Sequence, residues 1–282
     1  MELTMNLIST PNSHKHQTRL APGFFMISII SLTFYLLLLQ SPVPADAHFG
    51  MIIPSDNMVM QADKRTIDLA LSFSHPFEGQ GMVLDRPAAF DMYTAGKKHS
   101  LLSELKPAKV MEYDAFSIPV NIRRPGIYSF VMTPQPYWEP AEDCFIIHIT
   151  KTVVTAFGDD DGWDAELGLE TEIVPLSKPY GLYAGNLFQG IVKVDGKPVP
   201  FAEVEIEYYN QDNRATAPTD YMVTQTIKAD ANGVFSYCAP RSGWWGFAAL
   251  STSDKKKMHN GQKKDIELGA VIWVKFENWQ EN

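Results

Sequence analysis

Short runs of apolar and β-branched residues, each closed by glycine, proline or asparagine, fill almost the whole chain after residue 48. The run 126–133 (GIYSFVMT) is typical, because two sets of side chains alternate along it as on the two faces of a strand. No sustained 3.6-residue spacing of an amphipathic helix accompanies these runs. The pattern predicts an all-β protein with immunoglobulin-like β-sandwich architecture. The predicted strands are 58–60, 66–73, 88–93, 116–121, 126–133, 145–150, 188–194, 202–209, 221–229, 234–238, 243–250 and 270–276.

The pattern of short apolar runs is interrupted between residues 157 and 179. The segment 158–162 (GDDDG) is acidic and turn-prone, and Pro175 and Pro179 close the stretch. We therefore expect two immunoglobulin-like β-sandwich domains. The expected division is an N-terminal, metal-binding sandwich over 48–155, a linker over 156–179, and a C-terminal sandwich of the carboxypeptidase-regulatory or Cna-B-like type over 180–276.

The first 47 residues have the layout of a secretory signal peptide. Lys15 and Arg19 precede an apolar run over 24–39, which is followed by prolines and the small-residue triplet Ala45-Asp46-Ala47. The alternative is a permanent membrane anchor. The apolar run is shorter than the roughly 20 residues that span a bilayer. We therefore expect cleavage after Ala47, export, and no stable membrane insertion afterwards.

The charge of the chain favours a cation over an anion as ligand. Its formal net charge is −9, with 45% hydrophobic and 20% charged residues, which is ordinary globular composition. An acidic chain lacks the basic footprint of a nucleic-acid-binding protein. Nucleophile-elbow, phosphate-loop and H-E-x-x-H motifs are missing from the sequence, so we do not expect an enzyme.

The two cysteines, Cys144 and Cys238, fall in different expected domains. Export would allow a disulfide to persist. Because each cysteine lies in an apolar strand context, we expect two free, buried thiols and no thiolate metal site.

His48 is the strongest candidate ligand, because cleavage after Ala47 makes it the first residue of the mature chain. A first-position histidine offers its α-amine and its imidazole Nδ1, which close a six-membered chelate ring. The reference pKa values of these groups, about 7.7–8.0 and about 6.5, allow both to be unprotonated near neutral pH. Nitrogen ligands of this kind suit Ni(II) or Cu(II). The alternative is a histidine at a frayed, solvated end.

Two further histidines are candidate ligands. His75 follows an apolar strand in a glycine-rich loop, where an imidazole can reach a site without disturbing a sandwich core. His148 lies inside the run 145–149, so it is either a core histidine or a ligand. Possible completing groups are Glu78, Met82 and Glu142, whereas His99 and His259 lie beside lysines and are expected to be solvated.

Several segments together resemble the periplasmic nickel/cobalt-uptake component family. They are 47–50 (AHFG), 75–79 (HPFEG), 163–166 (WDAE), 172–176 (EIVPL), 179–185 (PYGLYAG), 195–199 (DGKPV), 230–235 (DANGVF) and 243–247 (GWWGF). The resemblance implies a periplasmic, non-catalytic metal-binding protein that captures nickel or cobalt and delivers it to membrane transporter components.

Two other functions stay open at the level of sequence. One is a copper-binding protein in which His48 and a second histidine form a brace, either as a copper carrier or as an oxidative polysaccharide-cleaving enzyme. The other is a structural β-sandwich whose tryptophans serve adhesion, although core packing is the more usual role for Trp163, Trp244 and Trp245.

Overall fold

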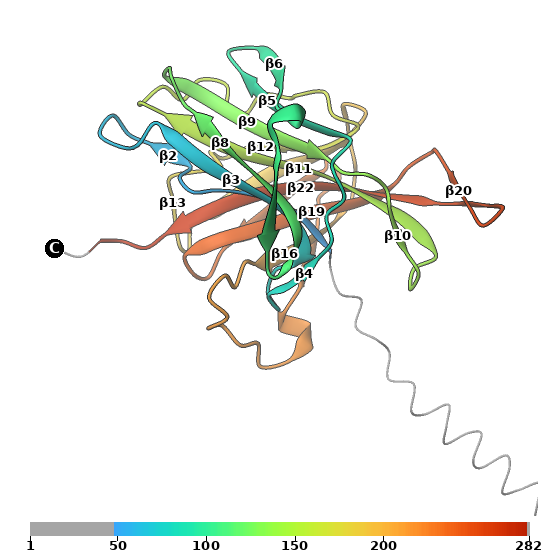
Figure 1. Cartoon of the computed structure of the whole chain (residues 1–282). Coiled ribbons are helices and arrows are strands. Elements are labelled where there is room, and N and C mark those ends of the chain that lie inside the picture. The colour runs from blue at the N-terminus through green and yellow to red at the C-terminus, as the bar shows by residue number, and fades with distance from the viewer. Residues whose placement is uncertain (1–47, 281–282) are drawn as a thin grey trace, which may run out of the picture. The chain divides into compact units, whose positions relative to one another are not determined.

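The computed structural model describes residues 48–280, which form β-strands and two short 3-10 turns joined by loops (Figure 1). The expected signal peptide lies outside these residues. Within residues 48–280, no helix is long and apolar enough to cross a membrane. The elements are β1 (Phe49–Pro54), β2 (Met58–Val59), β3 (Thr66–His75), β4 (Gln80–Met82), β5 (Ala89–Thr94), β6 (Lys97–Ser100), η1 (Leu102–Glu104), β7 (Lys106–Val110), β8 (Tyr113–Asn121), β9 (Gly126–Thr133), β10 (Tyr137–Glu139), β11 (Cys144–Ala156), β12 (Thr171–Pro175), β13 (Leu182–Tyr183), β14 (Leu187–Val194), β15 (Lys197–Pro198), β16 (Glu203–Tyr208), η2 (Asp220–Met222), β17 (Gln225–Lys228), β18 (Val234–Cys238), β19 (Gly243–Thr252), β20 (Lys257–His259), β21 (Gln262–Lys264) and β22 (Ile266–Glu277).

A large central sheet runs through both halves of the chain. Its main strand order is β17-β16-β19-β22-β11-β9-β5-β6, so strands from before and after the acidic stretch pair directly. The junction is the parallel pair β11–β22, which runs from Phe145↔Ile266 to Thr152↔Trp273 (Figure 1). The two halves therefore share one sheet.

The first hydrophobic core lies between this sheet and a smaller one. The smaller sheet has the order β1-β3-β8-β7, with β4 paired to β3. Ile52, Leu69 and Leu71 from the smaller sheet pack with Phe90 and Phe130 from the central sheet, and all five are fully buried. Every second residue of β3 and β8 is apolar, which explains why their inner face forms a core.

The second core lies against the other end of the central sheet. It is covered by a four-stranded sheet in which β14 pairs with β12, β15 and β18. Phe188, Val192 and Phe235 from that sheet pack on Phe247 and Ile272 from β19 and β22. The all-β sandwich prediction is confirmed, and the independence of the two expected domains stays a prediction.

Local sequence signals place several strands correctly. The structure has β9 and β18 at the predicted bounds, 126–133 and 234–238. The turn between β14 and β15 contains Asp195 and Gly196 with φ of 47° and 72°, which is the left-handed backbone that a two-residue hairpin requires. The prediction missed β1 and also β12, which lies inside the expected linker.

The cysteine prediction is correct only in part. Both thiols are free, but Cys144 is half-buried at the start of β11 and Cys238 is exposed at the end of β18. The predicted burial is wrong for both thiols for the same reason, because each cysteine occupies the terminal position of its strand.

An ion pair buried at both ends joins β12, near the end of the expected linker, to the central sheet. Lys151 Nζ of β11 lies 2.7 Å from Glu172 Oε1 of β12, and both side chains are nearly inaccessible to water. Burial lowers the pKa of Lys151, and the Glu172 carboxylate opposes this shift. The backbone N–H of Leu167 also donates to Glu172, at 3.0 Å, so the pair fixes the segment that precedes β12.

Replacing Lys151 with methionine should destabilise the fold strongly, because it leaves the Glu172 carboxylate buried without its counter-charge. The expected loss in the free energy of unfolding is about 3–5 kcal/mol, measured by urea denaturation. The double variant Lys151→Met/Glu172→Leu should recover most of that loss. As control, Lys228→Met removes an exposed pair with Glu203 and should cost less than about 1 kcal/mol. Equal losses in the two single variants would contradict this assignment.

Candidate metal site

The antiparallel register of β1 and β3 brings two of the predicted ligands together. Phe49 pairs with Ser74, so His48 and His75 occupy the next position along the same ladder. Their ring centroids are 4.7 Å apart at an interplanar angle of 54°. His75 is the buried last residue of β3, which corrects its predicted place in the following loop.

The third predicted ligand, His148, enters the same region from β11. It is only 2% exposed and pairs with Gly269 of β22. A Cβ atom at Gly269 would lie 2.2 Å from His148 Cδ2, so the imidazole occupies space that only glycine leaves free. The rings of His48 and His148 both contact the ring of Phe73, with centroid distances of 5.7 and 6.2 Å.

Two carboxylates that the sequence did not indicate face these histidines. Glu139 Oε2 of β10 lies 3.3 Å from His48 Nε2, and Glu267 Oε1 of β22 lies 3.4 Å from His148 Nε2. Among the described residues, His148 Nδ1 is one of a few buried polar atoms without a hydrogen-bond partner. A carboxylate that holds Nε2–H leaves Nδ1 as the free lone pair, which is the usual arrangement behind a metal-bound histidine.

The environment keeps the His48 imidazole unprotonated. Burial is the main cause and His75 the second, and together they lower the pKa of His48 to about 4 against the opposing influence of Glu139. His148 and Glu267 also act on this pKa, so all four of these side chains lie within electrostatic range of His48. A metal ion would therefore not have to displace a ring proton from His48 at neutral pH.

The metal-free protein should lose stability as the pH falls from about 6.5 to about 4. In this window the unfolded chain protonates His48 while the folded chain resists protonation, so protons favour unfolding. Urea unfolding of the wild type and of His48→Gln across this range isolates the effect from the titration of carboxylates. The stability difference between the two proteins should change in favour of His48→Gln as the pH falls, and a difference independent of pH would refute the assignment.

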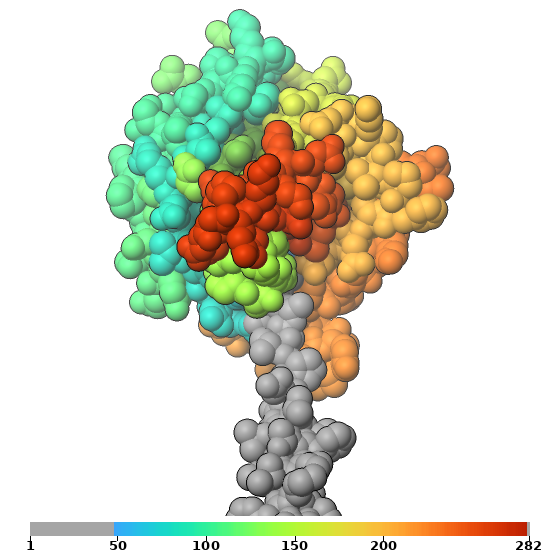
Figure 2. Space-filling view, turned by 90° about the vertical axis from the view of Figure 1, so that its right-hand side faces the viewer, coloured from blue at the N-terminus to red at the C-terminus, as the bar shows by residue number. Residues whose placement is uncertain are grey.

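Of the remaining candidate residues, one lies near the histidine cluster and the others lie elsewhere in the protein. Burial raises the pKa of Glu142, and His148 and Glu139 also influence it, so Glu142 lies at the margin of the cluster. Glu78 is exposed, and Met82 packs against the first core. His99 is exposed as expected, whereas His259 stacks on Trp138 at 3.8 Å. Figure 2 shows the β20–β21 hairpin that carries His259 (red) directly above the β10 segment (yellow-green).

Within residues 48–280, no three His, Cys, Asp or Glu side chains already stand in the geometry of a formed metal centre. The histidines and carboxylates described above form a buried cluster of imidazole nitrogens with carboxylate neighbours, which is a donor set that fits a divalent transition metal.

The loop that follows His75 is clamped by the second half of the chain. The backbone N–H of Phe77 donates to Glu207 Oε2 at 3.2 Å, and Glu207 also accepts a hydrogen bond from Thr224. Asn210 donates through its backbone to Pro76 O at 3.1 Å and through its side chain to Phe77 O at 3.0 Å. Residues at the end of β16 and just after it therefore fix the backbone next to His75.

Truncating Asn210 to alanine should loosen this loop without unfolding the sandwich. The amide hydrogens of Phe77 and Glu78 are expected to exchange faster with deuterium, because the clamp loses its side-chain donor. Asn232→Ala is the matched control, since Asn232 sits in an exposed turn and, among residues 48–280, bonds to Asp230 alone. Unchanged exchange at residues 77–79 in Asn210→Ala would show that the clamp does not hold the loop.

The geometry defines a β-sandwich protein with a buried histidine–carboxylate cluster where its two halves meet. The chain belongs to the family described as a domain of unknown function (DUF4198), whose model matches residues 45–253. A search of curated proteins finds no match.

Solved structures resemble the chain only loosely. The D0-D1 domain of intimin is 10% identical and covers 82% of this chain and 100% of its own length, with a TM-score of 0.23. A putative carbohydrate binding protein from Bacteroides uniformis is 10% identical over 82% of this chain and 99% of its own, with a TM-score of 0.24. The fibronectin(III)-like modules of Clostridium thermocellum CbhA are 8% identical over 82% and 100%, with a TM-score of 0.19.

Proposed function

We propose that this protein is exported to the periplasm, binds one Ni(II) or Co(II) through the terminal His48, and delivers it to a membrane transporter. The observation that carries the proposal is the placement of His48. Its ring lies 4.7 Å from that of His75, and its Nε2 faces Glu139 at 3.3 Å. With Nε2–H held by the carboxylate, Nδ1 is the atom left to coordinate.

Cleavage after Ala47 would complete the donor set. The new α-amine and Nδ1 of His48 close one chelate ring, and His75 adds an imidazole from the neighbouring strand. His148 lies close enough to act on the pKa of His48 and supplies a further buried imidazole. The metal is cargo in this proposal, and no described residue is assigned a catalytic role.

A copper-binding histidine brace is the second candidate function. The juxtaposition of His48 and His75 favours it specifically, because a brace needs a terminal histidine and one more imidazole beside it. Copper binds more tightly than nickel or cobalt at an unselective nitrogen site, so affinity alone does not distinguish the two functions. The metal content of protein purified from its own periplasm does.

Protein that begins at His48 should bind one Ni(II) or Co(II), and protein that retains Ala47 should bind at least tenfold more weakly. The extra residue converts the α-amine into a peptide amide, which removes the easily deprotonated donor and its chelate ring. His75→Ala should also weaken binding. Isothermal titration calorimetry on the three forms measures these differences.

The matched control for His75→Ala is His99→Ala, which removes an exposed histidine on β6 and should leave the affinity unchanged. Equal affinities for the authentic and the Ala47-extended forms would place the metal elsewhere in the protein. Tight copper binding with negligible nickel or cobalt binding, together with copper in the native protein, would establish the second function instead.

A further inference from the structure

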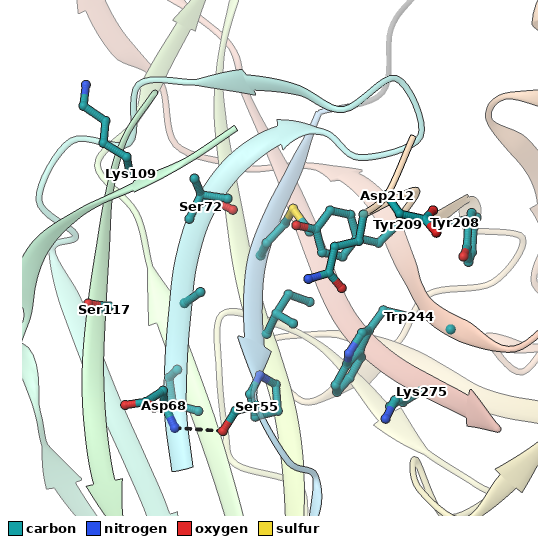
Figure 3. Close-up of a pocket in the computed structure, with 18 residues that line it drawn as sticks. Ser55, Asp68, Ser72, Lys109, Ser117, Tyr208, Tyr209, Asp212, Trp244 and Lys275 are labelled. Carbon is teal, nitrogen blue, oxygen red and sulfur yellow. Dashed lines mark hydrogen bonds between the residues drawn. The ribbon is translucent and has the colours of Figure 1, made fainter. Parts of the chain in front are cut away.

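A groove of about 690 Å³ opens on the side of the small sheet that faces away from the first core (Figure 3). Its floor consists of small side chains from β3 and β8, including Ala70, Ser72 and Ser117. Its wall is formed by Tyr209 and Trp244, which follow β16 and begin β19. The volume falls within the roughly 300–1,000 Å³ typical of small-molecule sites.

The groove presents neutral hydrogen-bonding groups that the protein does not use. In the described part of the chain, Trp244 Nε1, Tyr209 Oη and Ser72 Oγ have no hydrogen-bond partner, although all three residues are at least half-buried. In Figure 3 the Tyr209 hydroxyl and the Trp244 ring both lie on the side of β1 that faces away from β3. Burial also raises the pKa of Tyr209, which keeps its hydroxyl neutral. A ligand that reaches these groups must offer several donors and acceptors.

The groove carries little net charge. Two lysines and two aspartates line it, namely Lys109, Lys275, Asp68 and Asp212. Three of them are paired with neighbours outside the groove, Lys109 with Asp114 at 2.8 Å, Lys275 with Glu277 at 2.8 Å, and Asp212 with Arg214 at 3.2 Å. Asp68, which is exposed, is the one of the four without an ion pair among the described residues, so the groove does not favour an anion.

An extended peptide would find no backbone to pair with on the floor. β3 and β8 are interior strands whose two edges are already occupied, and the edge strand β7 reaches the groove only through Lys109 and Val110. The outer edge of β1 is closed by side chains, because Trp273 Nε1 donates to Gly50 O at 2.8 Å and Thr152 Oγ1 donates to Ile52 O at 2.7 Å. A lipid chain would leave the indole and hydroxyl groups desolvated and unpaired, which is unfavourable.

We propose that this groove binds a neutral oligosaccharide. Sugar rings combine apolar faces, which pack on an aromatic wall, with hydroxyl groups that pair with Tyr209, Trp244 and Ser72. The inference goes beyond the proposed metal function and does not depend on it, because the groove and the histidine cluster have no lining residue in common.

The test is calorimetric titration of the metal-free protein with maltotriose, cellotriose and triacetylchitotriose, with tryptophan fluorescence as a second readout. At least one trisaccharide should bind saturably with one-to-one stoichiometry. Tyr209→Phe, which removes one hydroxyl, should weaken binding about fivefold, as expected for one neutral hydrogen bond. Ala70→Leu should abolish binding because the larger side chain fills the floor of the groove.

Tyr221→Phe is the matched control, since Tyr221 is 93% exposed and lies outside the groove. It should bind like the wild type, and thermal melts verify that each variant is folded. Absence of binding for all three trisaccharides would overturn the proposal, and so would binding that Ala70→Leu leaves intact. Nickel titration of the same variants reports separately on the histidine cluster, so failure of one proposal is distinguishable from failure of the other.

Discussion

The position of β1 is the constraint on which the rest of the structure depends. This strand pairs with β3 along one edge only, and its other edge meets the central sheet through side-chain donors. Trp273 Nε1 and Thr152 Oγ1 satisfy the carbonyls of Gly50 and Ile52, each contributing roughly 1 kcal/mol. A Cβ atom at Gly50 would lie 2.2 Å from Thr150 Oγ1, so the close approach of β1 to β11 requires glycine at that position.

The two faces of β1 connect the halves of the molecule. Ile52 packs into the first core, whereas Phe49 and Met51 pack with Ala248, Val271 and Trp273 of β19 and β22. Because His48 immediately precedes this strand, both contacts fix its backbone. The cluster then gathers His75 from β3, His148 from β11, and Glu139 and Glu267 from β10 and β22. Rigid strands of this kind can hold ligating atoms more precisely than loops do.

The sequence predicted those parts of the fold that depend on local pattern. Alternation identified β9 and β18. It missed β1 and β12 because nearly all of their side chains are buried, which removes the alternation that marks a half-buried strand. Glu139 and Glu267 were missed for another reason. His148 and Glu267 meet through the parallel pairing of β11 and β22, which joins segments 119 residues apart and leaves no local signal.

In the proposed function, the same geometry connects metal binding to export. The cluster of His48, His75 and Glu139 depends on strand register and burial, which do not require a free amine at residue 48. The chelate does require that amine. A chain that retains its leader would therefore have the imidazoles in place but lack the second donor of His48, and nickel or cobalt would be bound tightly only after cleavage. Such an arrangement would prevent the protein from taking up metal in the cytoplasm, because the strongest donor pair would come into existence on the far side of the membrane.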